Sequence, residues 1–139
     1  MPSGSCLCQG VKYQFKGEPI SKAVCHCQSC HKLSSGSSVN LLVPHDHFRI
    51  TAGRDHMREC NLTHESGMHL TTHFCADCGC VLYKTADRPE FVDDVIVLAG
   101  TLDDPGALDE AEPEAEFFVG ERAKWWPALK GVRQLAGFT

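Results

Sequence analysis

The stretch Cys25-His26-Cys27-Gln28-Ser29-Cys30 places three thiols within six residues, and the other cysteines are arranged around it. A C-x-C pair, Cys6-Leu7-Cys8, precedes it, and a C-x-x-C pair, Cys75-Ala76-Asp77-Cys78, follows it. Structural zinc sites take four thiolate or imidazole ligands, whereas catalytic zinc sites take three and keep one position open. The seven cysteines divide as four plus three. We therefore expect one closed zinc site and one open zinc site.

The two outer pairs are suited to a shared metal, because they lie near opposite ends of a β-rich region. A zinc ion held by Cys6, Cys8, Cys75 and Cys78 would join the first strand to a later hairpin. Structural zinc contributes roughly 10–16 kcal/mol of apparent binding energy that is realised as folding energy. This exceeds the stability of a typical domain, about 5–15 kcal/mol. Losing any of these four cysteines should therefore unfold much of the chain.

The central cysteines Cys25, Cys27 and Cys30 can bind a second zinc through three thiolates, which leaves its fourth ligand undetermined. Cys60 and Cys80 are candidates, although free cysteine usually packs as a small buried hydrophobe, which is the favoured interpretation of both. Five histidines are further candidates, and each is more simply a surface or hydrogen-bonded residue; they are His26, His31, His64, His69 and His73. If the fourth position is open, zinc can lower the pKa of a substrate thiol and hold the thiolate for attack on a small aldehyde. The alternative is a second structural zinc closed by His or Cys.

The composition favours a reducing compartment over a secreted disulfide scaffold. Nine cysteines are an odd number, and the N-terminus has no basic-then-apolar signal pattern, so we expect a cytoplasmic protein. No apolar run approaches the roughly 20 residues of a membrane helix, so we expect no membrane partner. The net charge is −5, and residues 103–116 carry seven acids without Lys or Arg. Nucleic-acid binding is therefore disfavoured, and the acidic stretch is expected to be a solvated loop.

The 139 residues predict a single domain, 1–139, of mainly β structure. Short strands alternate with turn signals, and no long amphipathic helix is apparent. Residues 27–33 should form a loop with one helical turn, and 123–129 another helical turn. The expected strands are 11–15, 20–24, 39–43, 48–51, 57–63, 68–74, 81–83, 95–99 and 117–119, with 57–63 and 68–74 forming a hairpin and 95–99 central.

Four segments together resemble the glutathione-dependent formaldehyde-activating enzyme (GFA) family, also called the centromere-protein-V-like domain. They are Gly4-Ser5-Cys6-Leu7-Cys8, Cys25-His26-Cys27-x-x-Cys30-His31-Lys32, Cys75-x-x-Cys78-Gly79 and Gly100-Thr101-Leu102-Asp103-Asp104-Pro105. The resemblance covers nearly the whole chain, and the order and spacing of the cysteines are its specific part.

The resemblance implies a β-tent, Mss4-like fold of packed antiparallel sheets with two zinc ions. By motif position, Cys6, Cys8, Cys75 and Cys78 would hold the structural zinc, and Cys25, Cys27 and Cys30 the catalytic zinc beside glutathione. The founding activity is a carbon–sulfur lyase reaction, the condensation of formaldehyde with glutathione to S-hydroxymethylglutathione. This chain departs from the family at Gln9, usually Gly, at Cys80, usually Ser or Thr, and at Glu116, usually His.

Glutathione carries two carboxylates, so its site should present basic side chains. Lys32, Arg122 and Lys124 are the candidates, and Trp125 could form a wall of the pocket; each charge is otherwise a solvated surface residue. The favoured function is thus a zinc-dependent enzyme that joins a thiol to formaldehyde or another small electrophile. The alternative is a non-catalytic two-zinc module that binds a protein. The oligomeric state, a homo-oligomer included, and the true substrate stay open at this level.

Overall fold

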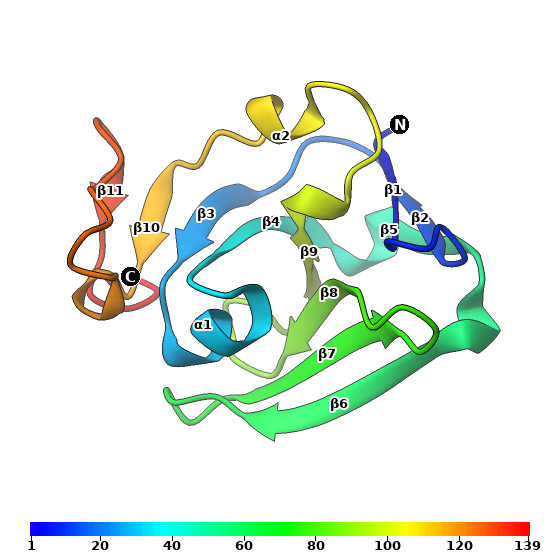
Figure 1. Cartoon of the computed structure of the whole chain (residues 1–139), viewed down its shortest axis with the longest axis horizontal. Helices are drawn as coiled ribbons and strands as arrows, with labels where there is room; N and C mark the ends of the chain where they lie inside the picture. Colours follow the sequence, from blue (N-terminus) through cyan, green and yellow to red (C-terminus); the bar gives the residue numbers. More distant parts are fainter.

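The computed structural model describes residues 1–139 and contains eleven strands and two short α-helices (Figure 1). The helices are α1 (Gln28–Ser34) and α2 (Ala107–Glu110). The strands are β1 (Ser3–Ser5), β2 (Lys12–Phe15), β3 (Ser21–Cys25), β4 (Ser38–Pro44), β5 (Phe48–Ala52), β6 (Met57–Thr63), β7 (His69–Cys75), β8 (Val81–Ala86), β9 (Asp94–Leu98), β10 (Ala115–Phe117) and β11 (Arg133–Gln134). The mainly β class predicted from the sequence is confirmed.

The strands form two sheets, one of three strands in the order β1-β2-β5 and one of eight in the order β11-β10-β3-β4-β9-β8-β7-β6. Neighbours pair antiparallel except that β10 runs parallel to both β3 and β11. The N-terminus lies beside the small sheet, and the C-terminus lies beside β10 and β11 at the other side of the molecule (Figure 1). The parallel pairing of β10 with β3 brings residues 115–117 alongside Ala23–Cys25, a contact that the sequence pattern did not indicate.

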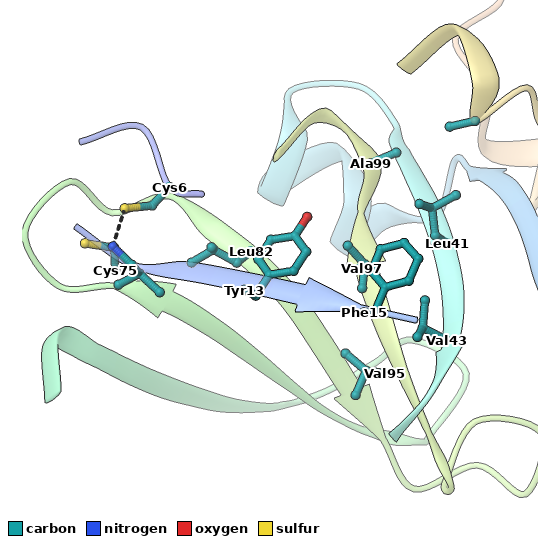
Figure 2. Packing of buried hydrophobic residues seen from close by; sticks show 12 residues of the cluster. Cys6, Tyr13, Phe15, Leu41, Val43, Cys75, Leu82, Val95, Val97 and Ala99 are labelled. Atoms are coloured by element: carbon teal, nitrogen blue, oxygen red, sulfur yellow. Dashed lines mark hydrogen bonds between the residues drawn. The ribbon is translucent and has the colours of Figure 1, made fainter. Parts of the chain in front are cut away.

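The main core lies between the small sheet and one face of the large sheet. Tyr13 and Phe15 alternate along β2 toward this face and are almost completely buried, as period-two patterning requires. They pack in one cluster with Leu82, Val95 and other aliphatic residues of the large sheet, and Cys6 and Cys75 lie together at one end of it (Figure 2). The outer cysteine pairs therefore lie where the two sheets meet.

The other face of the large sheet carries a second cluster. In β9, Val95 and Val97 belong to the main core, whereas Ile96 packs with Leu70 and Phe91 in the second cluster. A continuous apolar run is the pattern of a strand covered on both faces, so the predicted central position of this segment is confirmed. Phe138, near the C-terminus, packs against the second cluster and also against the central cysteines.

Most predicted elements are present within one or two residues, and two predictions were wrong. The late strand is Ala115–Phe117 rather than 117–119, because Phe118 adopts a left-handed backbone (φ 55°) that ends the extended chain. Residues 123–129 contain no helix and run as turns and irregular chain around Pro127, since proline lacks the backbone N–H that a helix interior needs. No helix is long and apolar enough to cross a bilayer.

Candidate functional site

Four cysteines from two distant segments converge into the first candidate metal centre. Cys6 and Cys8 follow β1, while Cys75 ends β7 and Cys78 lies in the turn before β8. Their sulfur atoms all lie within 4.8 Å of one another. The chain turns sharply around Cys8, where the N–H of Gln9 donates to the carbonyl oxygen of Cys6 at 2.9 Å and Gln9 itself lies in the left-handed region at φ 64°. Glycine tolerates this conformation best, which gives a physical reason for the family's preference for glycine at this position.

The spacing of these sulfur atoms fits a tetrahedral zinc ion. Four sulfurs at about 2.3 Å from zinc lie about 3.8 Å apart. The Sγ atoms of Cys6 and Cys8 are separated by 3.6 Å, and those of Cys8 and Cys75 by 3.8 Å. The N–H of Val11 donates to Cys6 Sγ at 3.3 Å. Backbone N–H groups of Cys8 and Cys80 lower the pKa of the Cys78 thiol to about 6, which favours the thiolate form that binds metal.

The second centre consists of three buried thiols delivered by β3 and α1. Cys25 is the last residue of β3, and Cys30 is the buried residue of α1. Cys27 is the N-cap of α1, and its sulfur accepts a hydrogen bond from the N–H of Cys30 at 3.3 Å. The same turn that starts the helix therefore gathers the thiols. The predicted loop and helical turn over residues 27–33 is confirmed, as the seven-residue helix α1.

Hydrogen-bond donors surround the sulfur of Cys30. Ser38 Oγ donates to this sulfur at 3.0 Å, and Lys84 Nζ lies 3.9 Å from it. Hydrogen bonds from the thiols of Cys25 and Cys27 lower the pKa of Cys30, and they outweigh the effect of its burial. This donor set fits a metal-binding thiolate. The Sγ atoms of Cys27 and Cys30 are only 3.1 Å apart, so they would have to separate slightly to ligate zinc.

The three thiols line a cavity in the structure. Eleven of its fifteen lining residues are hydrophobic, the three cysteines included, and its free volume is about 50 Å³. Leu70, Phe91 and Ile96 of the second cluster contribute apolar walls, and the four polar lining residues are Ser21, Asn40, His64 and Lys84. A position beside the thiols is therefore accessible from a small, mostly apolar space. This is the arrangement that ligand sites commonly show, apolar walls with few polar groups.

Among the histidines, His64 is the best-placed candidate for a fourth zinc ligand, but its hydrogen bonds argue against that role. Its ring approaches Cys27 together with the carboxylate of Glu65. Nδ1 accepts a hydrogen bond from the N–H of Ser66 at 3.0 Å. In a neutral imidazole the other nitrogen then carries the proton, so Nε2 has no lone pair for a metal. Glu65 is also engaged, because it accepts from the N–H and Oγ of Ser29 in the first turn of α1.

The two remaining cysteines join neither centre. Cys80 is half-buried and packs against the main core, so the interpretation as an apolar thiol is confirmed. Cys60 is exposed on β6, and the expectation that it is buried was wrong. The reason is its place in the sheet, since β6 is an edge strand and four consecutive residues, 58–61, are exposed.

Glu116 forms a buried hydrogen-bond network next to the second centre. One carboxylate oxygen accepts from His26 Nε2 at 2.7 Å. The other accepts from Gln134 Nε2 at 2.6 Å and from the N–H of Leu129 at 2.8 Å. Trp126 packs edge-on against the His26 ring, at 5.7 Å between centroids. The residue that replaces the family's usual histidine thus holds the C-terminal segment against the loop between Cys25 and Cys27.

The residues proposed to contact glutathione lie outside the cavity lining; they are Lys32, Arg122, Lys124 and Trp125. Lys32 is exposed on α1, and Trp125 is 81% exposed and stacks on Trp126. Arg122 donates to Gln134 Oε1 at 2.6 Å and pairs weakly with Glu116 at 3.5 Å. These side chains thus offer charge and an aromatic surface, and none of them reaches the cavity beside the thiols.

Two polar residues of the cavity, Lys84 and Asn40, were not among the site residues predicted from the sequence. Lys84 belongs to the apolar face of β8, where Leu82, Lys84 and Ala86 alternate with less buried neighbours. A charged residue at a buried position of an alternating strand is the signal that could have identified it. Asn40 is likewise a polar residue inside the apolar strand β4. Lysine and asparagine are common on surfaces, so only the strand period marks them.

Comparisons with known proteins identify a matching family and a solved structure of similar fold. The model of the glutathione-dependent formaldehyde-activating enzyme family matches residues 1–121. The crystal structure of a Rhodobacter sphaeroides protein, a structural genomics target, is similar in fold, with a TM-score of 0.61 and 16% sequence identity over 80% of this chain and 96% of that chain. No curated protein matches the chain. Because the family model covers most of the residues, both cysteine centres included, this chain belongs to the glutathione-dependent formaldehyde-activating enzyme (GFA) family.

Proposed function

We propose that this protein is a zinc-dependent carbon–sulfur lyase or synthase of the GFA type. It would join a thiol, with glutathione as the favoured one, to formaldehyde or another small aldehyde. The observation that carries this proposal is the difference between the two cysteine centres. One has four sulfurs at tetrahedral spacing, whereas the other has three sulfurs on a cavity wall and a neighbouring histidine whose hydrogen bonds disfavour ligation.

Zinc held by Cys25, Cys27 and Cys30 would supply Lewis acidity that lowers the pKa of a substrate thiol. The chain supplies the surroundings in which that thiol reacts. Ser38 and the N–H of Cys30 donate to the ligand sulfurs and keep them oriented. The apolar walls exclude water, which strengthens electrostatic interactions in the cavity. These features favour addition of a thiolate to an uncharged carbonyl compound.

Glutathione would lie mainly outside the cavity and insert only its thiol. A free volume of about 50 Å³ is too small for a tripeptide, because even a benzene-binding cavity measures roughly 150 Å³. Lys32, Arg122, Lys124 and Trp125 remain the proposed contacts for the rest of the molecule. Their position outside the cavity lining is compatible with this arrangement, in which the aldehyde would occupy the cavity and the rest of the peptide would bind to the surface.

Exchange NMR on an equilibrium mixture of formaldehyde and glutathione tests the proposal. The addition also proceeds without enzyme, so only a rate increase that the Cys27→Ser variant lacks counts as support. Serine is a good helix N-cap, so this variant should keep α1 while removing one zinc ligand. Cys60→Ser, which changes an exposed cysteine outside both centres, is the matched control and should behave as wild type.

Full acceleration by Cys27→Ser would overturn the role of the three-cysteine centre. No acceleration by wild-type protein that carries two zinc ions would overturn the formaldehyde reaction itself. In either case the zinc content, measured by inductively coupled plasma mass spectrometry, shows whether the variant changed the metal or only the chemistry.

A further inference from the structure

Lys84 is a buried basic residue that the proposed function does not use. The residue is 4% exposed, and the sole hydrogen-bond partner of its side chain is Cys30 Sγ at 3.9 Å, which is a long contact. No carboxylate forms an ion pair with it. Burying an ammonium group is costly unless an anion or a hydrogen-bond acceptor compensates it. Since Lys84 lines the cavity, an acceptor atom on a ligand there would supply the missing partner.

Asn40 presents the complementary group in the same cavity. It is 9% exposed, and its Nδ2 donates to Ser38 Oγ at 2.9 Å and to the carbonyl oxygen of Ser38 at 3.4 Å. These two bonds determine the orientation of the amide. Its Oδ1 is buried without any hydrogen-bond donor, although buried polar atoms are rarely left unpaired. Asn40 and Lys84, which both line the cavity, thus carry an unpaired acceptor and a poorly paired donor.

We propose that Lys84 and Asn40 bind the oxygen of a short-chain aldehyde and then the hydroxyl group of its thiol adduct. The proposal rests on the proposed function and names its electrophile as an aldehyde with a small apolar substituent. A carbonyl oxygen accepts from Lys84. The hydroxyl formed from it can still accept from Lys84 and can also donate to Asn40 Oδ1. The adduct therefore satisfies both groups, whereas the free aldehyde satisfies one.

The reaction balances with the groups present. The sulfur of the thiolate forms a bond to the carbonyl carbon, and the π electrons of the C=O bond move to oxygen. That oxygen takes a proton from solvent, which replaces the proton that the thiol released, so thiol and aldehyde combine without loss of atoms. The ammonium of Lys84 stabilises the negative charge as it develops on oxygen. Lys84 would therefore contribute more to the transition state than to binding of the free aldehyde.

The walls of the cavity select the substituent. Leu70, Phe91 and Ile96 surround the space with apolar atoms, so a methyl group gains apolar contacts that formaldehyde lacks. The free volume of about 50 Å³ is a third of the roughly 150 Å³ of a benzene-binding cavity, so it excludes aromatic and branched aldehydes. Acetaldehyde is thus a better candidate for the electrophile than formaldehyde or benzaldehyde.

Binding of acetamide to the zinc-loaded protein tests the assignment without requiring turnover. This unreactive amide carries an acceptor for Lys84, a donor for Asn40 and a methyl group for the walls. We expect saturable ¹H–¹⁵N chemical-shift changes that centre on residues 25–30 and on Phe138. Lys84→Met and Asn40→Leu should each raise the dissociation constant about tenfold or more. Lys12→Met, at an exposed position on β2, should leave it unchanged.

Kinetics on the same variants separate chemistry from binding. With acetaldehyde and glutathione, Lys84→Met should lower kcat more than it raises KM, whereas Asn40→Leu should raise the KM of the adduct in the cleavage direction and leave the KM of acetaldehyde unchanged. Lys84→Gln replaces Lys84→Met if the latter fails to fold. Zinc content must stay at two, because a Lys84 variant with one zinc would show that Lys84 only balances the thiolate charge, and this would overturn the assignment.

The remaining outcomes distinguish the two proposals. Acceleration by wild type without acetamide binding, or with equal binding in all variants, leaves the GFA-type function standing and overturns the Lys84–Asn40 site. Acetamide binding that depends on Lys84, without acceleration for any aldehyde, supports the carbonyl site and overturns the lyase function.

Discussion

Glu116 is a buried carboxylate whose hydrogen bonds connect distant segments of the chain. It is fully buried and accepts hydrogen bonds from a side chain of the central loop and from two residues of the C-terminal segment. Because β10 pairs with β3, this network also joins the strand that ends at Cys25 to the chain beyond Phe118. A residue that is unusual for the family thus has a structural explanation here.

We expect Glu116→Ala to lower the free energy of unfolding by about 2–4 kcal/mol, because it leaves several buried donors without an acceptor. Urea denaturation measures this loss. Glu114→Ala is the matched control, since Glu114 is exposed and precedes the same strand. Equal effects of the two substitutions would show that the network contributes no stability.

The pH dependence of this effect follows from the direction of the pKa shift. Burial alone would raise the pKa of Glu116, but hydrogen bonds from Gln134 and His26 outweigh it and lower the pKa. A lowered folded-state pKa stabilises the fold above the unfolded-state value of about 4.3, and this contribution disappears as pH falls through the folded-state pKa. The stability difference between wild type and Glu116→Gln should therefore shrink below about pH 4.3. A difference that stays constant from neutral to acidic pH would contradict this explanation.

At the scale of elements, the four-cysteine centre holds together segments that secondary structure leaves separate. The segment of Cys6 and Cys8 connects strands of the small sheet, and Cys75 and Cys78 lie between β7 and β8 of the large sheet. Outside the named strands the direct β-bridge in this region is a single pair, Gly4 with Leu102. A metal at this centre would therefore secure the packing of one sheet on the other.

We expect Cys75→Ser to remove one zinc and to abolish the cooperative thermal transition, because a structural zinc contributes roughly 10–16 kcal/mol. Circular dichroism and zinc analysis on the purified variant check both effects. Cys60→Ser should retain two zinc ions and the wild-type melting temperature. A Cys75→Ser protein that melts like wild type would contradict a structural role for this centre.

At the scale of the whole molecule, the two centres differ in ligand number and in exposure. A larger number of ligands favours retention of zinc, whereas greater exposure favours its loss. The four-cysteine centre has more ligands but includes the exposed Cys8, whereas all three cysteines of the other centre are buried. Affinity depends on the ligands, while the rate of metal loss also depends on access. Chelation must therefore be measured at equilibrium.

In an equilibrium titration with a graded chelator, we expect the three-cysteine centre to lose zinc first while the circular dichroism spectrum is unchanged. Removal of the second zinc should then unfold the protein. Comparison of wild type with Cys27→Ser identifies the first zinc, because the variant should show only the second step. Simultaneous loss of both metals and the fold would favour a non-catalytic two-zinc module.

The sequence alone predicted the class of the fold and the members of both cysteine centres, because these depend on local patterns. Period-two alternation marks Tyr13 and Phe15 as buried residues of a strand, and the C-x-C and C-x-x-C spacings mark thiols that can meet at one metal. The burial of β9 on both faces was also apparent from its unbroken apolar run. Such signals arise from neighbouring residues and do not require knowledge of the tertiary fold.

Only the tertiary structure could place the residues whose surroundings come from distant segments. Cys60 is exposed because β6 is the edge of the sheet, and Glu116 is buried because β10 runs parallel to β3. Lys84 and Asn40 line one cavity although 44 positions separate them in the sequence. Pairing partners, sheet edges and cavities are determined by long-range packing. For this protein, the sequence determined which residues can bind metal, and the packing decided which polar groups a substrate would meet beside them.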